Sequence, residues 1–223
     1  MTTITPELVL KAYAYGVFPM AKSREDTEVF WVQPKLRGVI PLDQFHVSRS
    51  LRKTLRRGVF RVTANADFVG VLQGCAESAE GRTDTWINDH IMRLFIQLYE
   101  AGLAHSIETW LDDEDGTPHL AGGLYGLAMG AAFFGESMFS RATDASKVAL
   151  THLGAILKKG GFTLLDTQFI TDHLKTFGAI EIPQKEYLAQ LGAALARRGE
   201  FGAPVSQPEL EALLLSQRST QIS

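Results

Sequence analysis

Two polar segments of the chain carry side chains that could hold a nucleophile between them. Residues 133–141, FFGESMFSR, place Glu136 after an apolar run, and residues 164–168, LLDTQ, place Asp166 and Gln168 at the end of another. Side chains alternate along a strand, so Asp166 and Gln168 are predicted to point to the same face. If the two segments form neighbouring strands, we expect Glu136, Asp166 and Gln168 to converge in one cleft.

A run of positive charge is a second candidate for chemistry. Residues 48–61 hold six basic side chains, on a helix predicted to end at Gly58 and on the strand after it: Arg49, Arg52, Lys53, Arg56, Arg57 and Arg61. Charge runs of this kind are usually solvated helix faces. On an otherwise acidic chain they could also concentrate the positive potential that binds phosphate. From the residues alone, both interpretations stay open.

The composition sets the limits for any function. The 223 residues are 45% hydrophobic, which is enough to bury a substantial core in one large domain or two small ones. The net charge of −3 means that any nucleic-acid contact must come from a local patch. The single cysteine, Cys75, has no partner for an internal disulfide. Neither a secretory leader nor an apolar run of roughly 20 residues is present, so we expect a cytoplasmic protein without membrane contact.

The elements that must position these residues fall into two sections with a composition shift near residue 65. The first section is predicted to hold a helix from Thr5 to Gly16, short strands at 30–32 and 38–40, and the basic helix. The second is predicted to begin with helices at Asp67 and Asn88 and a hairpin of 105–111 with 119–127. It continues with the segments 131–136 (strand ending in a polar turn), 143–160 (helix capped by Thr143 or Asp144), 163–167 (strand), 172–177 (helix), 179–182 (strand) and 183–198 (helix).

This order predicts an α/β (α+β) fold with a mixed sheet and an antiparallel start. We expect a small N-terminal α/β domain at 1–65, an acyltransferase-like catalytic domain at 66–198, and a tail at 199–223 with a short helix near 208–214. The pattern suits the N-acetyltransferase superfamily, whose fold splays two strands apart to admit an acyl donor. A helix N-terminus beside such a splay can bind phosphate, and Arg141 and Lys147 flank that position here.

Several motifs occur in an order and spacing that closely resemble the leucyl/phenylalanyl-tRNA–protein transferases. The resemblance covers roughly residues 8–190, and GESMFSR at 135–141 is its most specific string. The other matching motifs are AY at 12–13, GVFP at 16–19, HVSRS at 46–50, WI at 86–87, HSIE at 105–108, GGLYG at 122–126, ASK at 145–147, DTQ at 166–168, DH at 172–173, GA at 178–179 and IP at 182–183.

The resemblance implies an enzyme that takes Leu, Phe or, less readily, Met from an aminoacyl-tRNA and joins it to the N-terminal Arg or Lys of an acceptor protein. That product enters the N-degron (N-end rule) route of protein degradation. In the family's proposed mechanism Asp166 polarises Gln168, whose oxygen accepts a hydrogen bond from the attacking amine, and Glu136 holds a substrate ammonium. Because glutamine is a weak base, we interpret its role as orientation and electrostatics. The aminoacyl ester is already activated, so we expect no metal and no cofactor.

The resemblance also implies where the substrates bind. An apolar donor pocket would be formed by Trp86, Leu124, Phe133 and Leu165, with Tyr13 and Met20 nearby. The basic residues of 49–61, with Arg141 and Lys147, would contact tRNA. Longer family members carry Trp in place of Met20, Tyr in place of Phe95, and an N-terminal extension. We expect the protein to act as a monomer.

Other functions and plainer interpretations stay open. A coenzyme-A-dependent acetyltransferase fits the fold but normally opens the helix after the splayed strand with a glycine-rich turn, and residues 140–143, SRAT, have no glycine. A non-catalytic RNA-binding module would leave Asp166 and Gln168 without a role. Trp86, Phe133, Leu165 and Tyr187 could be ordinary core, the polar trio a buried structural network, and His105 and His173 structural residues.

Overall fold

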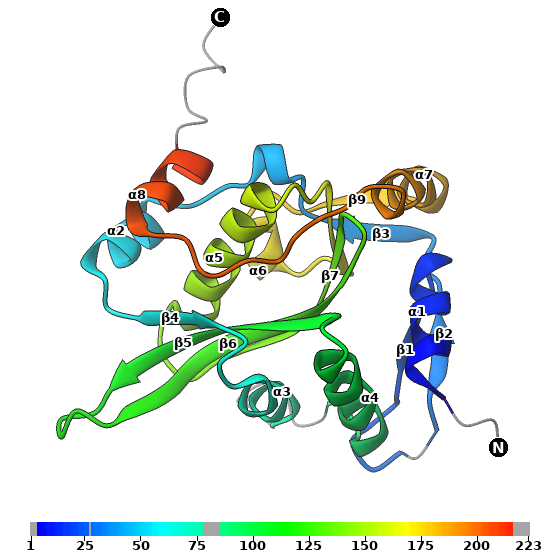
Figure 1. Ribbon diagram of the computed structural model, residues 1–223, viewed down its shortest axis with the longest axis horizontal. Coiled ribbons are helices and arrows are strands. Elements are labelled where there is room, and N and C mark those ends of the chain that lie inside the picture. The colour runs from blue at the N-terminus through cyan, green and yellow to red at the C-terminus, as the bar shows by residue number, and fades with distance from the viewer. Residues whose placement is uncertain (1–3, 27, 78–84, 216–223) are drawn as a thin grey trace, which may run out of the picture.

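The computed structural model describes residues 4–26, 28–77 and 85–215. Within these residues, seven strands form one mixed sheet in the order β4-β5-β6-β7-β8-β3-β9 (Figure 1). Its strands are β3 (Leu36–Val39), β4 (Arg61–Ala64), β5 (Ala104–Asp112), β6 (Pro118–Met129), β7 (Ala132–Ser140), β8 (Leu164–Gln168) and β9 (Ile180–Pro183). The mixed α/β fold class predicted from the sequence is confirmed.

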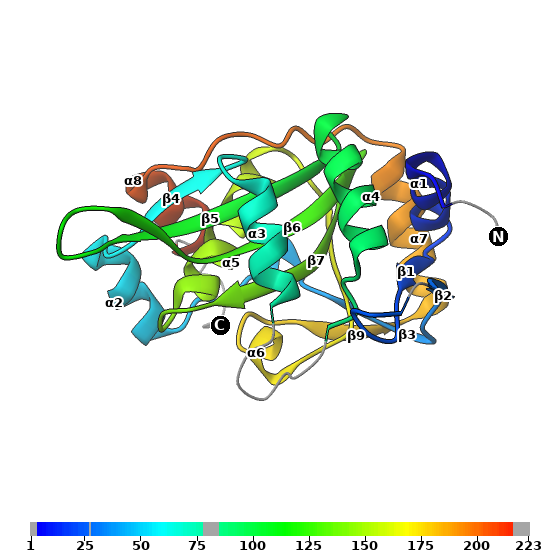
Figure 2. The same ribbon diagram turned by 90° about the horizontal axis from the view of Figure 1, so that it is seen from below.

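Helices cover both faces of this sheet and bury a hydrophobic cluster on each. On one face α3 (Phe68–Ala76) and α4 (Asp89–Glu100) pack on β5 and β6, as Figure 2 shows from below. On the other face α5 (Ala145–Lys159) packs on β5, β6 and β7. Against it lie α2 (Arg49–Arg57), the turn η1 (Leu42–Gln44) and the C-terminal turns α8 (Gln207–Leu210) and η2 (Glu211–Leu215).

The N-terminal section forms a small layer at one end of the sheet and also contributes strands to it. The helix α1 (Pro6–Ala14) begins at Thr5, whose hydroxyl accepts a hydrogen bond from the Leu8 N–H. A separate two-stranded sheet pairs β1 (Phe18–Met20) with β2 (Phe30–Val32). From the same section, β3 and β4 join the main sheet. The division at residue 65 is therefore not a division between sheets, and it stays a prediction.

The site is created where β7 and β8 part. These parallel strands pair only through residues 132–134 and 164–166, after which β7 continues alone on that side. The sequence predicted a strand at 131–136 running into a polar turn, which is wrong: β7 extends to Ser140. The reason is its other neighbour, because β6 stays paired with β7 as far as Gly122 and Ser140. The predicted splay of two strands is thus present.

The ends of β8 and α5 fix the geometry beside the splay. Gln168, the last residue of β8, has a left-handed backbone with φ of 57°. It pairs with Gly38 of β3, where a Cβ atom would lie 2.8 Å from the backbone carbon of Phe169. At the start of α5, Asp144 was predicted to cap with its side chain. That prediction is wrong, because its carboxylate accepts from Lys147 and Thr54 instead.

The last elements follow the predicted order. A short helix α6 (Asp172–Lys175) leads from β8 to β9, and α7 (Gln184–Leu195) then packs beside β3 and β9 (Figure 1). The predicted short helix near 208–214 is confirmed as α8 and η2, and the tail beyond residue 215 lies outside the described residues. No helix in the described part of the chain is both long and apolar enough to cross a bilayer.

Candidate active site

A cavity of about 420 Å³ occupies the gap between the parted strands β7 and β8. Its floor and walls come from β6, β7, α5 and the segment from β8 to α6, and β1 closes one side. The apolar residues that line it are Phe18, Met20, Trp86, Leu124, Met138, Phe139, Leu150, Leu153, Leu165, Phe169 and Leu174. Glu136, Gln168 and His173 are among the few residues that add polar groups. The cavity therefore combines an apolar body with a small set of oriented polar side chains.

Glu136 faces this cavity as a carboxyl group held by one tyrosine. The Tyr13 hydroxyl, fully buried on α1, donates to Glu136 Oε1 at 2.7 Å. Burial raises the pKa of Glu136 to about 8, although the Tyr13 hydrogen bond opposes this and the nearby Asp166 adds to it. In the empty pocket at pH 7 the neutral acid is favoured. A cation entering the cavity would shift Glu136 toward its charged form.

Gln168 presents its amide to the cavity from the end of β8. The side chain is 6% exposed, and its Nε2 has no hydrogen-bond partner among the described residues. The left-handed turn at this position interrupts the strand alternation. As a result Gln168 lines the cavity, whereas Asp166 does not. This differs from the sequence prediction that both side chains would point into one cleft.

Asp166 lies beneath the cavity in a fully buried cluster with Arg37 and Tyr187. Arg37 Nε and Nη2 donate to the two carboxylate oxygens at 2.9 and 2.6 Å, and the Tyr187 hydroxyl donates at 2.7 Å. Asp166 Oδ1 also accepts from the backbone N–H of Gln168 at 2.8 Å. Burial alone would lower the pKa of the Arg37 guanidinium, but the hydrogen bonds to Asp166 raise it, so Arg37 stays charged.

The residues predicted to form the donor pocket are only partly brought together. Met20, Trp86, Leu124 and Leu165 line the cavity. Phe133 does not line it, because its fully buried ring packs on Phe162 and stacks on Phe201, with ring centroids 5.6 Å apart in the second pair. Tyr13 contributes through Glu136 rather than as part of the cavity wall. Leu150 and Leu153 of α5, which sequence reasoning had treated only as helix core, are further wall residues.

The two histidines expected to be structural have different surroundings. His105 Nδ1 lies 3.1 Å from Asn65 Nδ2 and its ring stacks on Phe201, which fits the structural interpretation. Burial lowers the pKa of His105 to about 4. His173 instead lines the cavity, with its Nε2 unpartnered among the described residues. Burial, with Lys147 nearby, lowers the pKa of His173 as well.

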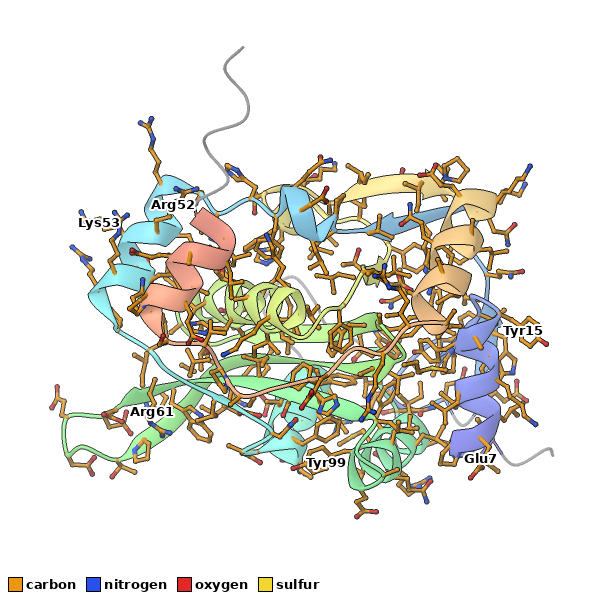
Figure 3. The ribbon with its side chains drawn as sticks, turned by 45° about the horizontal axis from the view of Figure 1, so that its top comes forward. Glu7, Tyr15, Arg52, Lys53, Arg61 and Tyr99 are labelled. Atoms are coloured by element: carbon orange, nitrogen blue, oxygen red, sulfur yellow. The ribbon has the colours of Figure 1, made fainter. Side chains whose placement is uncertain are left out.

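The predicted basic residues lie beside the cavity rather than in it. Arg49, Lys53, Arg56 and Arg57 are exposed on α2, and Figure 3 shows Arg52 and Lys53 projecting from that helix. Arg56 pairs with Glu211 and Arg61 stacks on Trp110. Near the N-terminus of α5, Arg141 pairs with Glu77 and Lys147 with Asp144. Because α2 packs on α5, all of these charges border the helix that forms one cavity wall.

Comparisons with known proteins agree along nearly the whole chain. A family model described as "Leucyl/phenylalanyl-tRNA protein transferase" matches residues 39–192, and one described as its N-terminal domain matches residues 2–35. The protein named leucyl/phenylalanyl-tRNA–protein transferase from Paramagnetospirillum magneticum is 55% identical over 201 residues, which are 90% of this chain and 94% of the relative. The protein of that name from Rhodopseudomonas palustris is 56% identical over 206 residues, covering 92% of this chain and 90% of the relative.

One solved structure matches in fold alone. The crystal structure of FemX aligns with a TM-score of 0.52 at 11% sequence identity, covering 92% of this chain and 69% of that one.

Proposed function

We propose a reaction for the cavity from the premise that the chain belongs to the leucyl/phenylalanyl-tRNA–protein transferase family. The chain is accordingly an aminoacyltransferase. Its donor is an aminoacyl-tRNA carrying Leu, Phe or, less efficiently, Met, and its acceptor is the N-terminal Arg or Lys of a protein. The product serves the N-degron route of protein degradation. The observation that carries this proposal is the apolar cavity at the β7–β8 splay, with Glu136 and Gln168 on opposite strands of it.

The chemical step needs alignment rather than strong acid–base catalysis. The α-amine of the acceptor attacks the ester carbonyl carbon, a C–N bond forms, the ester C–O bond breaks, and the ribose oxygen leaves with the proton that the amine loses. Gln168 borders the cavity with an unpartnered amide nitrogen. Its oxygen can orient the attacking amine while its N–H donates to the carbonyl oxygen as negative charge develops there. One amide would thus contact both reacting groups.

Glu136 is the residue suited to an ammonium group. A neutral carboxyl with a pKa of about 8 becomes ionised when a cation binds beside it, so binding of the charged substrate creates its own counter-ion. Tyr13 keeps Oε1 in place through its hydrogen bond and leaves Oε2 available. The proposal assigns to Glu136 the holding of a substrate ammonium.

The apolar body of the cavity would bind the donor side chain. Leu124, Leu150, Leu153 and Leu165 form walls that admit Leu, Phe and Met but disfavour charged side chains by desolvation. One methylene in such a pocket is worth about 1–3 kcal/mol, so discrimination among these three is modest. Met20, a flexible residue at the rim, softens the wall further.

The test is single-turnover transfer of leucine from Leu-tRNA to a peptide that begins with Arg. A peptide of the same sequence beginning with acetylated Arg has no free amine and serves as the acceptor control. Gln168→Ala is expected to lower the transfer rate on the order of a hundredfold, as for loss of one oriented catalytic dipole, with binding of Leu-tRNA nearly unchanged. An unchanged rate in Gln168→Ala, or transfer from acetyl-coenzyme A in place of Leu-tRNA, would contradict the proposal.

A further inference from the structure

The starting point is an arginine buried beneath the cavity. Arg37 is 1% exposed, although nothing in its short strand β3 marks it as different from an exposed basic residue. Its guanidinium lies over the rings of Phe18 and Tyr187 at 4.5 and 4.6 Å. Its Nη1 donates to the backbone oxygen of Gly16 at 3.1 Å. A buried charge of this kind persists only with a well-formed counter-ion, and Asp166 is that counter-ion.

The acceptor capacity of Asp166 is taken up by these partners. Oδ2 accepts from Arg37 Nη2 at 2.6 Å and from the Tyr187 hydroxyl at 2.7 Å. Oδ1 accepts from Arg37 Nε at 2.9 Å and from the Gln168 backbone N–H at 2.8 Å. The Gln168 side-chain amide makes no hydrogen bond with Asp166 in the described structure, so the link between the two residues is through the backbone.

That backbone link acts at a strained position. Gln168 has φ of 57°, a conformation that residues other than glycine adopt only when their surroundings impose it. The hydrogen bond from its N–H to Asp166 closes the turn, and the turn aims the Gln168 side chain into the cavity. The orientation of the amide therefore depends on a carboxylate that is itself held by two other side chains.

We infer that Arg37 and Tyr187 are positioning residues for the transfer reaction: they fix Asp166, and Asp166 fixes the left-handed turn that points Gln168 at the reacting groups. Asp166 then acts through the backbone of Gln168 and does not polarise its amide. This inference rests on the proposed function, because it supposes that Gln168 contacts the reacting groups. It adds residues of β3 and α7, far apart in sequence, to the machinery of the site.

Tyr187→Phe is the sharpest test because it removes one hydroxyl and leaves the ring beside Arg37. The matched control is Tyr99→Phe, which also removes one hydroxyl with one hydrogen bond, to the Asn65 backbone oxygen at 3.1 Å (Figure 3). Tyr99 lies on α4, outside the cavity lining. Single-turnover transfer from Leu-tRNA to an Arg-started peptide is measured for both, together with the Kd for Leu-tRNA and the Tm.

We expect Tyr187→Phe to slow transfer about tenfold while the Kd stays within about twofold, because the donor still binds and only the reacting amide is misaimed. Tyr99→Phe should transfer at the wild-type rate with a similar change in Tm. A rate for Tyr187→Phe equal to that of Tyr99→Phe would overturn the inference. A loss explained by weaker Leu-tRNA binding alone would also overturn it.

A double variant separates positioning from general loss of structure. If Tyr187 acts through Gln168, adding Tyr187→Phe to Gln168→Ala should lower the rate no further, because the misaimed side chain is already absent. Losses that multiply in the double variant would refute the inference. If Gln168→Ala alone transfers at the wild-type rate, the proposed function fails, which is a distinct result. Arg37→Lys, which keeps the charge but cannot span both carboxylate oxygens, should show the same kinetic pattern as Tyr187→Phe.

Discussion

Among the single residues, Glu136 carries the clearest electrostatic signature. Its pKa is raised to about 8 by burial in the cavity wall, whereas a carboxyl in an unfolded chain titrates near 4.3. Between these two values the folded protein holds a proton that the unfolded chain has lost. The folded state is therefore fully favoured below about pH 4 with respect to this group, and that contribution is lost as pH rises toward about 8.

Glu136→Gln should remove this pH dependence, because glutamine keeps the size and the acceptor for Tyr13 but does not titrate. We expect the variant to gain free energy of unfolding relative to the wild type by up to about 1.4 kcal/mol per pH unit between about pH 5 and 8. Urea unfolding at two pH values in this range measures it. Glu100→Gln, at an exposed site on α4, is the control and should show a much smaller difference. An equal stability difference at both pH values for Glu136→Gln would show that Glu136 is not buried as a neutral acid.

Arg37 and Tyr187 show why part of the site escaped sequence reasoning. Arginine in a short strand is normally exposed, and tyrosine on an amphipathic helix is normally core, so neither pattern pointed to chemistry. Their roles depend on β3 lying between β8 and β9, a pairing between segments more than a hundred residues apart. Glu136 and Gln168 were predictable because each sits at a strand end within a short polar motif. The turn that separates Gln168 from Asp166 was not, because it depends on Gly38 and Arg37.

At the scale of elements, local signals predicted helices better than strands. Thr5, Ser48, Asp67 and Asn88 each accept a backbone N–H at the helix start where they were expected or could be expected to do so. These caps are short-range interactions and can be recognised along the chain. The length of β7 was mispredicted because it is set by pairing with β6, which the local run GESMFS does not reveal. The polar end of that strand is what lines the cavity.

Gly38 on β3 is the element position that most directly supports the site. It pairs with Gln168, and a Cβ atom there would lie 2.8 Å from the Phe169 carbonyl carbon and 2.9 Å from Thr167 Oγ1. We expect Gly38→Ala to push the end of β8 away, lowering transfer at least about tenfold and stability by about 1–3 kcal/mol. Single-turnover transfer and urea unfolding measure both effects.

The control for this substitution is Gly192→Ala, in the helix α7. A Cβ atom at Gly192 meets nothing within 4 Å, so alanine there should raise stability by up to about 1 kcal/mol and leave transfer unchanged. If Gly38→Ala behaves like Gly192→Ala, the close approach of β3 to β8 is not what holds the end of β8.

For the whole molecule, the sequence was sufficient for fold class and family but not for domain layout. The order of helices and strands identified a mixed sheet with a splay, because helical periodicity and turn residues mark each element. The composition shift near residue 65 suggested a separate first domain, yet β3 and β4 complete the sheet of the second section. Composition cannot register such pairing, since it depends on which edges of the sheet are left open by the rest of the chain.

The distribution of charge over the molecule leads to the proposed tRNA surface. The exposed basic residues of α2 lie on the same face of the sheet as α5, and Thr54 on α2 donates to Asp144 at the start of α5 at 3.0 Å. Arg49, Lys53 and Arg57 make no ion pair or hydrogen bond with another side chain in the described structure. An acceptor stem lying along α2 could then reach the cavity past the N-terminus of α5.

Replacing Arg49, Lys53 and Arg57 together by alanine should weaken the binding of every tRNA alike, whatever its amino acid, because phosphate contacts carry no information on the donor. Each lost contact releases fewer counter-ions, so the slope of log affinity against log salt should become shallower by about 0.7–0.9 per contact and by about two overall. Leu-tRNA and Phe-tRNA binding at several salt concentrations measures the slope. Arg93→Ala, an exposed arginine on α4 across the sheet, should leave it unchanged. If the triple variant keeps the wild-type slope, the α2 charges form a solvated helix face, and tRNA must be held by charges elsewhere on the molecule.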